Sequence, residues 1–343
     1  MTADPAPDYG GLVRRVFVAA FGAAFGATLA LALASFVVGA YTAYFTALTP
    51  GVGAATLVPL FLWAGPVPVE LPHAFPYGAI FAFATAVYIL LFVAAARGGE
   101  SPARAVLGGA RTSLGALLSS DLVVAAVSLG FLTFVATGID AVTVAAGGQI
   151  GGLTGSDATV FLSTATAPIV EEVGFRVCII GLVALILSLG TGWRDSLRAL
   201  WRPSSVYEGR DVRAGKVYVI AVALVASSVA FGLAHIAAGS GWQPGKLPEA
   251  AFGGLVLGYV YVRYGLHVAV LTHWGVDFLG TAFAFFAEGR YGIPWGSDPG
   301  YLLQQWVTGD LFLGIGFLSF LLVSYLGARR LIARAQAGES PRM

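Results

Sequence analysis

Charged residues and cysteine are both scarce in this sequence. Asp, Glu, Lys and Arg make up only 11% of the 343 residues, whereas they make up about a quarter of soluble globular proteins. Hydrophobic residues account for 57%, and the mean hydropathy is +0.82, so the sequence predicts a membrane protein. Cys178 is the only cysteine, which excludes an intrachain disulfide and a zinc site built from several cysteines.

Two further patterns are missing. The net charge is only +1, and no basic tract is interleaved with aromatic residues, so nothing favours nucleic acid as a partner. The chain has four histidines, but none of them forms the His-Glu-x-x-His pattern of the common metalloproteases. These absences leave the lipid bilayer and molecules within it as the expected surroundings.

Long apolar segments dominate what remains. Each is roughly long enough to cross a bilayer, which needs about 20 residues in a helix. The sequence therefore predicts an all-α, polytopic transmembrane helical bundle, with 1–343 forming a single multi-pass domain in the cell membrane. The predicted spans number about eight: 16–45, 75–96, 121–139, 158–189, 217–238, 249–263, 266–286 and 309–328.

The basic residues provide a test of this topology. Cytoplasmic loops of membrane proteins are enriched in Lys and Arg. All but three of the 19 basic residues fall in alternate loops; Lys246 and Arg290 lie in the other set, and Arg176 lies inside a span. Both termini are therefore predicted to be cytoplasmic.

Two segments between the spans are ambiguous. Residues 51–65 are apolar but shorter than a span and are bracketed by Pro50, Pro66 and Pro68, so we predict a re-entrant or interfacial segment. Residues 191–216 contain Trp193 and Trp201 among basic residues. They are predicted to hold a short interfacial segment with its tryptophans at headgroup level, or else to form an ordinary solvated loop.

The segment 167–176, APIVEEVGFR, places Glu171, Glu172 and Arg176 inside the apolar segment 158–189. Each ionised side chain costs about 2.5 to 3.5 kcal/mol near the bilayer centre. The cost of all three about cancels the insertion free energy gained from the apolar residues of the segment. Glu172 and Arg176 are four residues apart and can pair on one helical face, whereas Glu171 points about 100° away and is left as a free acid or base. Pro168 predicts a helix kink one turn earlier. A buried ion pair that only fixes helix packing is the alternative explanation for Glu172 and Arg176.

Two other spans contribute helical i, i+4 pairs. Phe231 precedes His235, and His273 precedes Asp277, whereas His267 is expected at the membrane interface. His235 on its own is more often a packing histidine. Ionisable groups within spans must face the bundle interior or a wet cavity, so one shared site is the economical solution.

Such a site suits hydrolysis of an amide. A Glu with a His can activate a water, and a second His with a polar neighbour can stabilise an oxyanion. The same four residues, Glu171, His235, His273 and Asp277, are also possible ligands of a divalent metal such as zinc.

The ordered motifs EExxxR, FxxxH and HxxxD resemble those of the CPBP (Abi) family of intramembrane proteases, which includes prenyl-protein endopeptidases that cut CAAX motifs. The resemblance covers a core of roughly 158–286. It implies that Glu171 and His235 activate the water, that His273 and Asp277 form the oxyanion site, and that Glu172, Arg176 and Phe231 support them. Members are commonly labelled metalloproteases, while some are argued to be glutamate-dependent without metal.

Position 277 departs from the family pattern, which often has Asn there. An ionised Asp cannot donate a hydrogen bond to an oxyanion. Asp277 is therefore expected to be protonated, to orient His273, or to help bind a metal.

The sequence thus predicts an intramembrane endopeptidase that hydrolyses peptide bonds of membrane-associated proteins or peptides. A non-proteolytic membrane scaffold or immunity factor that keeps the fold is one alternative. An ion-coupled transporter is another, because intramembrane Glu, Arg and His also occur in proton relays. A transporter would be expected to carry internal repeats with broken helices in both halves.

Overall fold

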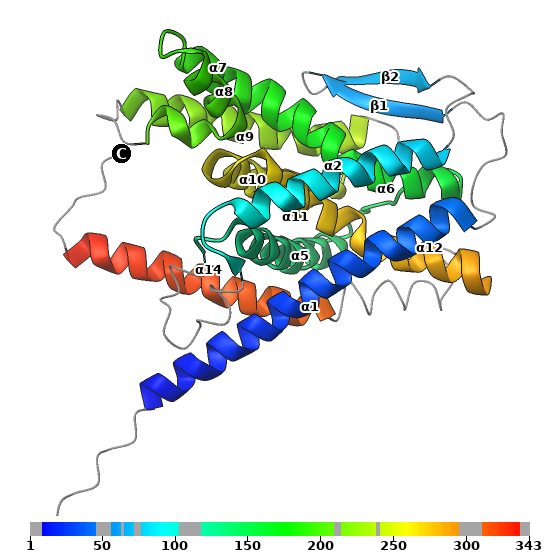
Figure 1. The fold of residues 1–343 in the computed structure, drawn as a ribbon, viewed down its shortest axis with the longest axis horizontal. Helices are drawn as coiled ribbons and strands as arrows, with labels where there is room; N and C mark the ends of the chain where they lie inside the picture. Colours follow the sequence, from blue (N-terminus) through cyan, green and yellow to red (C-terminus); the bar gives the residue numbers. More distant parts are fainter. Residues whose placement is uncertain are drawn as a thin grey trace, which may run out of the picture.

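A computed structural model of the chain describes residues 9–45, 56–62, 65–71, 77–102, 118–208, 214–237, 241–294 and 311–336, and every structural statement below concerns these residues. Helices form most of the described structure (Figure 1). They are α1 (Tyr9–Phe45), α2 (Tyr77–Arg97), α5 (Asp121–Ala145), α6 (Asp157–Glu171), α7 (Leu182–Leu187), α8 (Trp193–Trp201), α9 (Ala214–Ala237), α10 (Lys246–Tyr264), α11 (Leu266–Asp277), α12 (Leu279–Tyr291) and α14 (Leu311–Gln336). A π-helix, η1 (Glu172–Gly181), joins α6 to α7, and a 3-10 turn, η2 (Pro203–Val206), follows α8.

The helical bundle predicted from hydropathy is confirmed. Within the described ranges, four helices are long and apolar enough to cross a membrane: α1 from Ala19, α2, α5 and α9. Helices α11 and α12 count as a fifth span if they are taken together, although they bend by 41° at Phe278. The other predicted spans coincide with helix at 158–187, 249–263 and 311–328, and their crossing of the membrane stays a prediction, as does the cytoplasmic location of the termini. Residues 309–310 of the last span lie outside the described residues.

The segment predicted to be re-entrant contributes to a β-hairpin. Strand β1 (Thr56–Leu62) pairs antiparallel with β2 (Gly65–Leu71), so that Pro59 is opposite Pro68. Proline cannot donate a backbone hydrogen bond, so it disfavours helix interiors and central strands but is tolerated where both strands are edges. Residues 51–55 and 63–64 of the predicted segment lie outside the described part of the chain.

Helix α11 occupies the centre of the bundle. It packs against α2, α5, α6, α10, α12 and η1, and nine consecutive residues, from His267 to Gly275, are buried. A helix buried on all sides has no solvent or lipid face. In Figure 1, α5, α10 and α11 lie in the middle, with α7, α8 and α9 toward one side and α1 and α14 toward the other.

Aromatic packing fixes α11 against α1 and α2. The ring of Trp274 stacks on Phe36 of α1, with centroids 4.7 Å apart, and meets Phe92 and Tyr88 of α2 at 5.7 and 5.6 Å. Aromatic pairs of this kind contribute about 0.5 to 1.5 kcal/mol each beyond their buried area. Because Trp274 directly follows His273, this packing also restrains the histidine.

Small residues bring α9 and α10 close together. A Cβ atom added at Gly254 would lie 2.9 Å from the Cα of Ser228, and one at Gly258 would lie 3.2 Å from Leu224. Glycine at these positions therefore lets the two backbones approach, as at small-xxx-small helix contacts in membranes. This contact holds α9, which carries His235, against the rest of the bundle.

Candidate active site

The first element of the candidate site is the junction between α6 and η1. Helix α6 begins after Ser156, whose hydroxyl oxygen accepts a hydrogen bond from the backbone N–H of Thr159 at 3.3 Å. The helix continues through Pro168 to Glu171, and the local irregularity that follows is η1, a π-helix of 10 residues. π-helices are mostly single turns and are frequent at functional sites.

Helix α9 supports this irregular backbone. The hydroxyl of Ser227 donates a 2.8 Å hydrogen bond to the backbone carbonyl of Phe175, which lies inside η1. Side-chain hydroxyls from neighbouring helices commonly satisfy backbone groups that a distorted membrane helix leaves free. On the other side of the site, the Tyr88 hydroxyl donates a 2.8 Å bond to the Ala165 carbonyl of α6.

Glu172 and Arg176 form the ion pair predicted from their spacing. The Nε atom of Arg176 lies 3.2 Å from Oε2 of Glu172, and both side chains are fully buried, with 0% exposure. The contact is close but is not aligned as a hydrogen bond, and both Nη atoms of Arg176 lack a hydrogen-bond partner among the described residues. The guanidinium carbon also lies 4.3 Å from the ring centroid of Phe231, in a cation–π contact.

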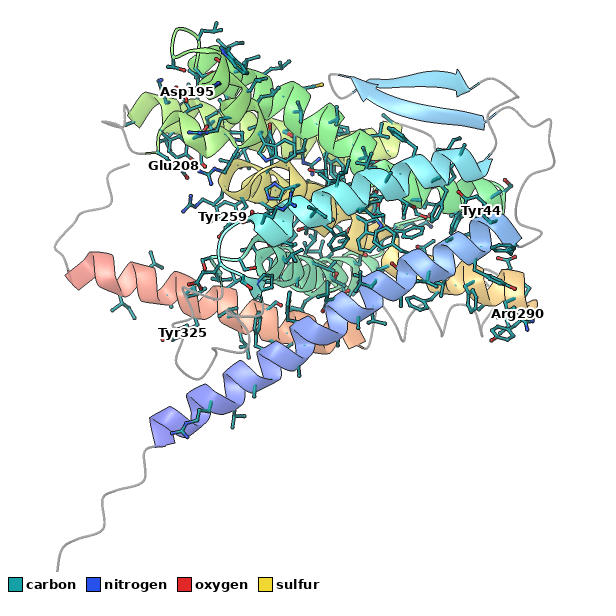
Figure 2. All side chains as sticks on the ribbon, viewed as in Figure 1. Tyr44, Asp195, Glu208, Tyr259, Arg290 and Tyr325 are labelled. Carbon is teal, nitrogen blue, oxygen red and sulfur yellow. The ribbon has the colours of Figure 1, made fainter. Side chains whose placement is uncertain are left out.

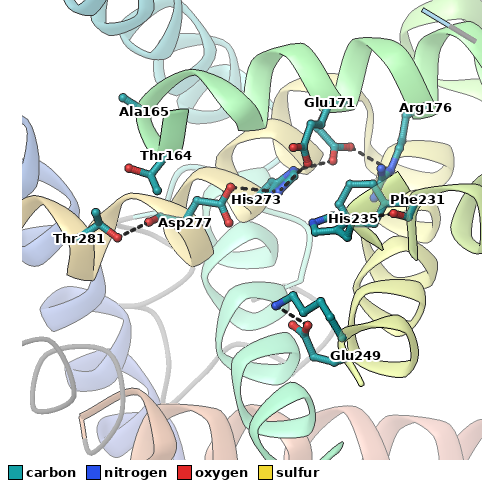
Figure 3. Close-up of polar contacts among 12 residues, drawn as sticks. Thr164, Ala165, Glu171, Arg176, Phe231, His235, Glu249, His273, Asp277 and Thr281 are labelled. Carbon is teal, nitrogen blue, oxygen red and sulfur yellow. Dashed lines mark hydrogen bonds and ion pairs between the residues drawn. The ribbon is translucent and has the colours of Figure 1, made fainter. Parts of the chain in front are cut away.

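His273 lies among three carboxylates (Figure 3). Its Nδ1 atom is 2.8 Å from Oε1 of Glu172, and its Nε2 atom is 3.3 Å from Oδ2 of Asp277 and 3.7 Å from Oε2 of Glu171. The Glu172 carboxylate is paired with Arg176 and can only accept hydrogen bonds. The Nδ1 atom of His273 therefore carries a hydrogen and donates to Glu172. The two adjacent glutamates thus approach opposite nitrogens of one imidazole.

Asp277 is the last residue of α11, directly before the bend at Phe278. Its backbone carbonyl accepts a 2.7 Å hydrogen bond from the hydroxyl of Thr281 in α12. The Asp277 side chain is 26% exposed, whereas that of His273 is only 6% exposed. The bend therefore leaves the carboxylate at the more open side of the site.

His235 reaches the same region from α9. Its Nδ1 atom lies 2.9 Å from the backbone carbonyl of Phe231. A carbonyl oxygen can only accept, so Nδ1 carries the hydrogen and Nε2 of neutral His235 is an acceptor. The Phe231 ring lies near both histidines, with its centroid 4.6 Å from that of His235 and 5.7 Å from that of His273.

The structure thus brings together all seven residues that the sequence singled out, although not all of them touch. Ion pairs or hydrogen bonds link four of them: Glu172, Arg176, His273 and Asp277. The Phe231 ring contacts the guanidinium group of Arg176. Among the described residues no hydrogen bond or ion pair joins Glu171 directly to His235. In Figure 3 the side chains of Glu171, His273 and His235 lie near one another and come from three different helices.

The residues present do not form a ready metal site. Where the chain is described, no group of three or more His, Cys, Asp or Glu side chains has the arrangement to hold a metal ion. The Nδ1 atom of His273 is used by Glu172, and its Nε2 atom faces two carboxylates.

Two contacts, one at the site and one elsewhere on α11, could not be read from local sequence. The bond from His273 to Glu172 spans 101 residues, whereas helical spacing pairs this carboxylate only with Arg176. The His267 side chain is 6% exposed, bonds Asp121 at 2.8 Å and stacks on Trp201, and its expected position at the membrane interface stays a prediction. The only sequence signal for the bond from His273 to Glu172 is that two glutamates are adjacent, whereas pairing with Arg176 accounts for only one of them.

Comparison with known proteins supplies the family. Residues 156–279, which include all three motifs, match the family model described as Rce1-like, type II CAAX prenyl endopeptidase. No curated protein and no solved structure gave a significant match to the chain. The match confirms the resemblance carried by the three motifs, and residues 156–279 belong to the CAAX protease-like (CPBP) family of membrane endopeptidases.

Proposed function

We propose that the protein is an intramembrane endopeptidase in which Glu171 and His235 activate a water and His273 stabilises the oxyanion. The observation that carries this proposal is the convergence of Glu171, His235 and His273 from three different elements, the end of α6, α9 and α11, in an otherwise apolar bundle. Ionisable side chains are costly in a bilayer and occur there mainly for function.

Water activation follows from the hydrogen-bonding capacity of the two side chains. Nε2 of His235 is an acceptor because Nδ1 donates to the Phe231 carbonyl. The side chain of Glu171 has no Arg or Lys ion pair among the described residues and is only 14% exposed. A water bound between an imidazole nitrogen and a carboxylate can donate to both, which makes its oxygen more nucleophilic.

The oxyanion site requires a proton on Nε2 of His273. Since Nδ1 donates to Glu172, only the imidazolium can also donate from Nε2. Three carboxylates surround this ring, and nearby negative charges favour the protonated form. The contact from Asp277 to Nε2 supports the interpretation in which Asp277 orients His273 rather than donating to the oxyanion itself.

The proton and bond balance is that of simple hydrolysis. The water oxygen forms a bond to the peptide carbonyl carbon while Glu171 takes the water proton, and the carbonyl oxygen becomes an oxyanion that accepts from His273. Collapse of this intermediate breaks the C–N bond, and the proton on Glu171 passes to the leaving nitrogen. Glu172 and Arg176 stay an ion pair that fixes the ring of His273.

The substrate is proposed to be a membrane-associated protein or peptide, because the site lies within the helical bundle. The family description names prenyl endopeptidases. The proposal covers substrates with and without a prenyl group. We further propose that 1–343 is one multi-pass domain in the cell membrane and that 158–286 forms its catalytic core.

Incorporation of ¹⁸O from labelled water into newly formed C-termini tests the proposed reaction. Membranes from cells that express the protein would be incubated in this water, and new C-terminal carboxylates would be identified by mass spectrometry. The proposal predicts one ¹⁸O atom in each new carboxylate, and loss of these ends with the Glu171→Gln, His235→Ala double variant. An unchanged set of ends would favour a scaffold that keeps the fold without proteolysis, and Glu171-dependent ion flux in liposomes would favour a transporter.

A further inference from the structure

We propose that a polar cavity between α7, α8, η2 and the start of α9 binds the phosphate of an anionic phospholipid headgroup. The cavity has a volume of about 100 Å³ and lies outside the cluster of Glu171, His235 and His273. Its lining combines hydroxyl and charged side chains, which suits a charged group rather than an acyl chain: Ser188, Thr191, Asp195, Arg198, Ser205, Glu208 and Lys216, with Ala199 and Val206.

The charges around the cavity favour an anion. Glu208 is already held by two guanidinium groups, since Arg202 and Arg263 each lie 2.5 Å from one of its oxygens. Its hydroxyl neighbour Ser204 donates a further bond at 2.9 Å. The lining itself holds two basic side chains, Arg198 and Lys216, and two carboxylates, Asp195 and Glu208. Arg202 and Arg263 lie outside the lining, but they offset the charge of Glu208, so the balance around the cavity is positive.

Two of the basic side chains can donate to a phosphate. Lys216 donates to the backbone carbonyl of Leu187 at 3.1 Å, which leaves its other N–H groups for a ligand. Arg198 is exposed on α8 and also lines the cavity. Guanidinium groups bind phosphate oxygens with two parallel, charge-assisted hydrogen bonds. The Ser205 hydroxyl lines the same space.

The surrounding apolar surface points to a lipid as the source of the phosphate. Trp193, Leu197 and Trp201 recur every four residues along α8 and are 69%, 55% and 41% exposed. Tryptophan is enriched at the headgroup level of membranes, and an exposed apolar stripe beside basic residues is typical of an interfacial helix. The adjacent ends of α7 and α9 also expose apolar side chains, Ile186 and Tyr218.

Helix α8 is firmly attached, so the cavity has a defined shape. The Tyr261 hydroxyl donates to the backbone carbonyl of Leu200 at 2.5 Å. Trp201 stacks on buried His267, with centroids 5.5 Å apart.

Figure 2 shows Asp195 and Glu208, which border the cavity, at the same end of the molecule. The sequence predicts that this end faces the cytoplasm.

Lipid titration of the purified full-length protein tests the proposal. The apparent unfolding midpoint would be measured in a neutral detergent against dioctanoyl phosphatidylglycerol, dioctanoyl phosphatidylcholine and inorganic phosphate. The matched pair of variants is Arg198→Gln, which removes a lining guanidinium, and Arg194→Gln, on the same helix but outside the lining. We expect phosphatidylglycerol to raise the midpoint saturably, with half-saturation weakened about tenfold in Arg198→Gln and unchanged in Arg194→Gln.

Several results would overturn this assignment. Equal weakening in both variants would mean diffuse surface charge, and an equal response to phosphatidylcholine would remove the selection for anionic lipid. An equal rise with inorganic phosphate alone would identify a free-anion site instead. If Arg198→Gln lacks cooperative unfolding, Ser205→Ala takes its place: wild-type half-saturation in this variant would contradict the proposal, and weakening of a few-fold would support it.

Discussion

Nδ1 of His273 lies 2.8 Å from Oε1 of Glu172, and the other oxygen of the same carboxylate lies 3.2 Å from Arg176. Glu172 therefore joins a histidine of α11 to an arginine of η1 through one buried group. It neutralises Arg176 and also fixes which nitrogen of His273 carries a hydrogen. Loss of this carboxylate should affect both folding stability and the chemistry of His273.

Glu172→Gln should lower the free energy of unfolding by about 3 to 5 kcal/mol, because it leaves the buried Arg176 charge unpaired. Replacing both partners, as Glu172→Gln with Arg176→Met, should recover much of this loss, since an apolar pair of similar size avoids the desolvation cost. Thermal unfolding of the purified variants in detergent measures both effects. An unfolding midpoint for Glu172→Gln equal to that of the wild type would contradict the ion pair's structural role.

His235→Ala should reduce the cleavage rate by about 10²- to 10⁴-fold, the usual contribution of a side chain that takes part in general acid–base catalysis. Its side chain bonds only a carbonyl of its own helix, so the unfolding midpoint should change little. Single-turnover cleavage in liposomes, with circular dichroism as a check of fold, separates these outcomes. Retention of full activity would remove His235 from the mechanism.

Asp277→Asn distinguishes the three roles open to this residue. If Asp277 orients His273, the Asn carbonyl oxygen can still accept from Nε2, so activity should stay within about tenfold of the wild type. Asp277→Ala should lose considerably more. An inactive Asn variant, combined with loss of wild-type activity in a chelator that added zinc restores, would instead indicate a metal ligand.

Phe231→Leu should cost about 1 to 2 kcal/mol of unfolding free energy, since it removes the ring beneath the desolvated Arg176 guanidinium but keeps apolar volume. His235 bonds the main chain of residue 231, so its orientation and the cleavage rate should persist within a few-fold. Phe317→Leu, at a side chain that is 49% exposed, is the matched control. A loss of activity as large as that of His235→Ala would show that the ring itself takes part.

Local spacing was sufficient to predict some of the candidate site. Residues four apart on a helix lie on one face, and this gave the Glu172–Arg176 pair and the approach of Asp277 to His273. Hydropathy likewise located helix at all eight predicted spans. Hydropathy did not predict the bend at Phe278, because the apolar composition does not change there. The bend is accompanied by a hydrogen bond from the Thr281 hydroxyl to the Asp277 carbonyl, which hydropathy does not report.

Contacts across the chain required the structure. An α-helical wheel separates Glu171 from Glu172 and suggests unrelated roles, whereas both approach His273 because the imidazole presents two nitrogens in different directions. The π-helix η1 follows from tertiary support such as the Ser227 bond, which no local pattern indicates. The hairpin was missed because its apolar residues resemble a membrane segment, although its prolines argue against a helix.

The central claim is that the Glu171 carboxylate is the base for peptide-bond hydrolysis. The most direct test is the cleavage rate of Glu171→Gln in liposomes, on a reporter peptide that the wild-type protein cuts, beside Glu100→Gln as an exposed control outside the site. The account predicts a loss of at least about 10²-fold for Glu171→Gln with an unchanged unfolding midpoint, and wild-type cleavage by Glu100→Gln. Cleavage at the wild-type rate by folded Glu171→Gln protein would contradict the claim.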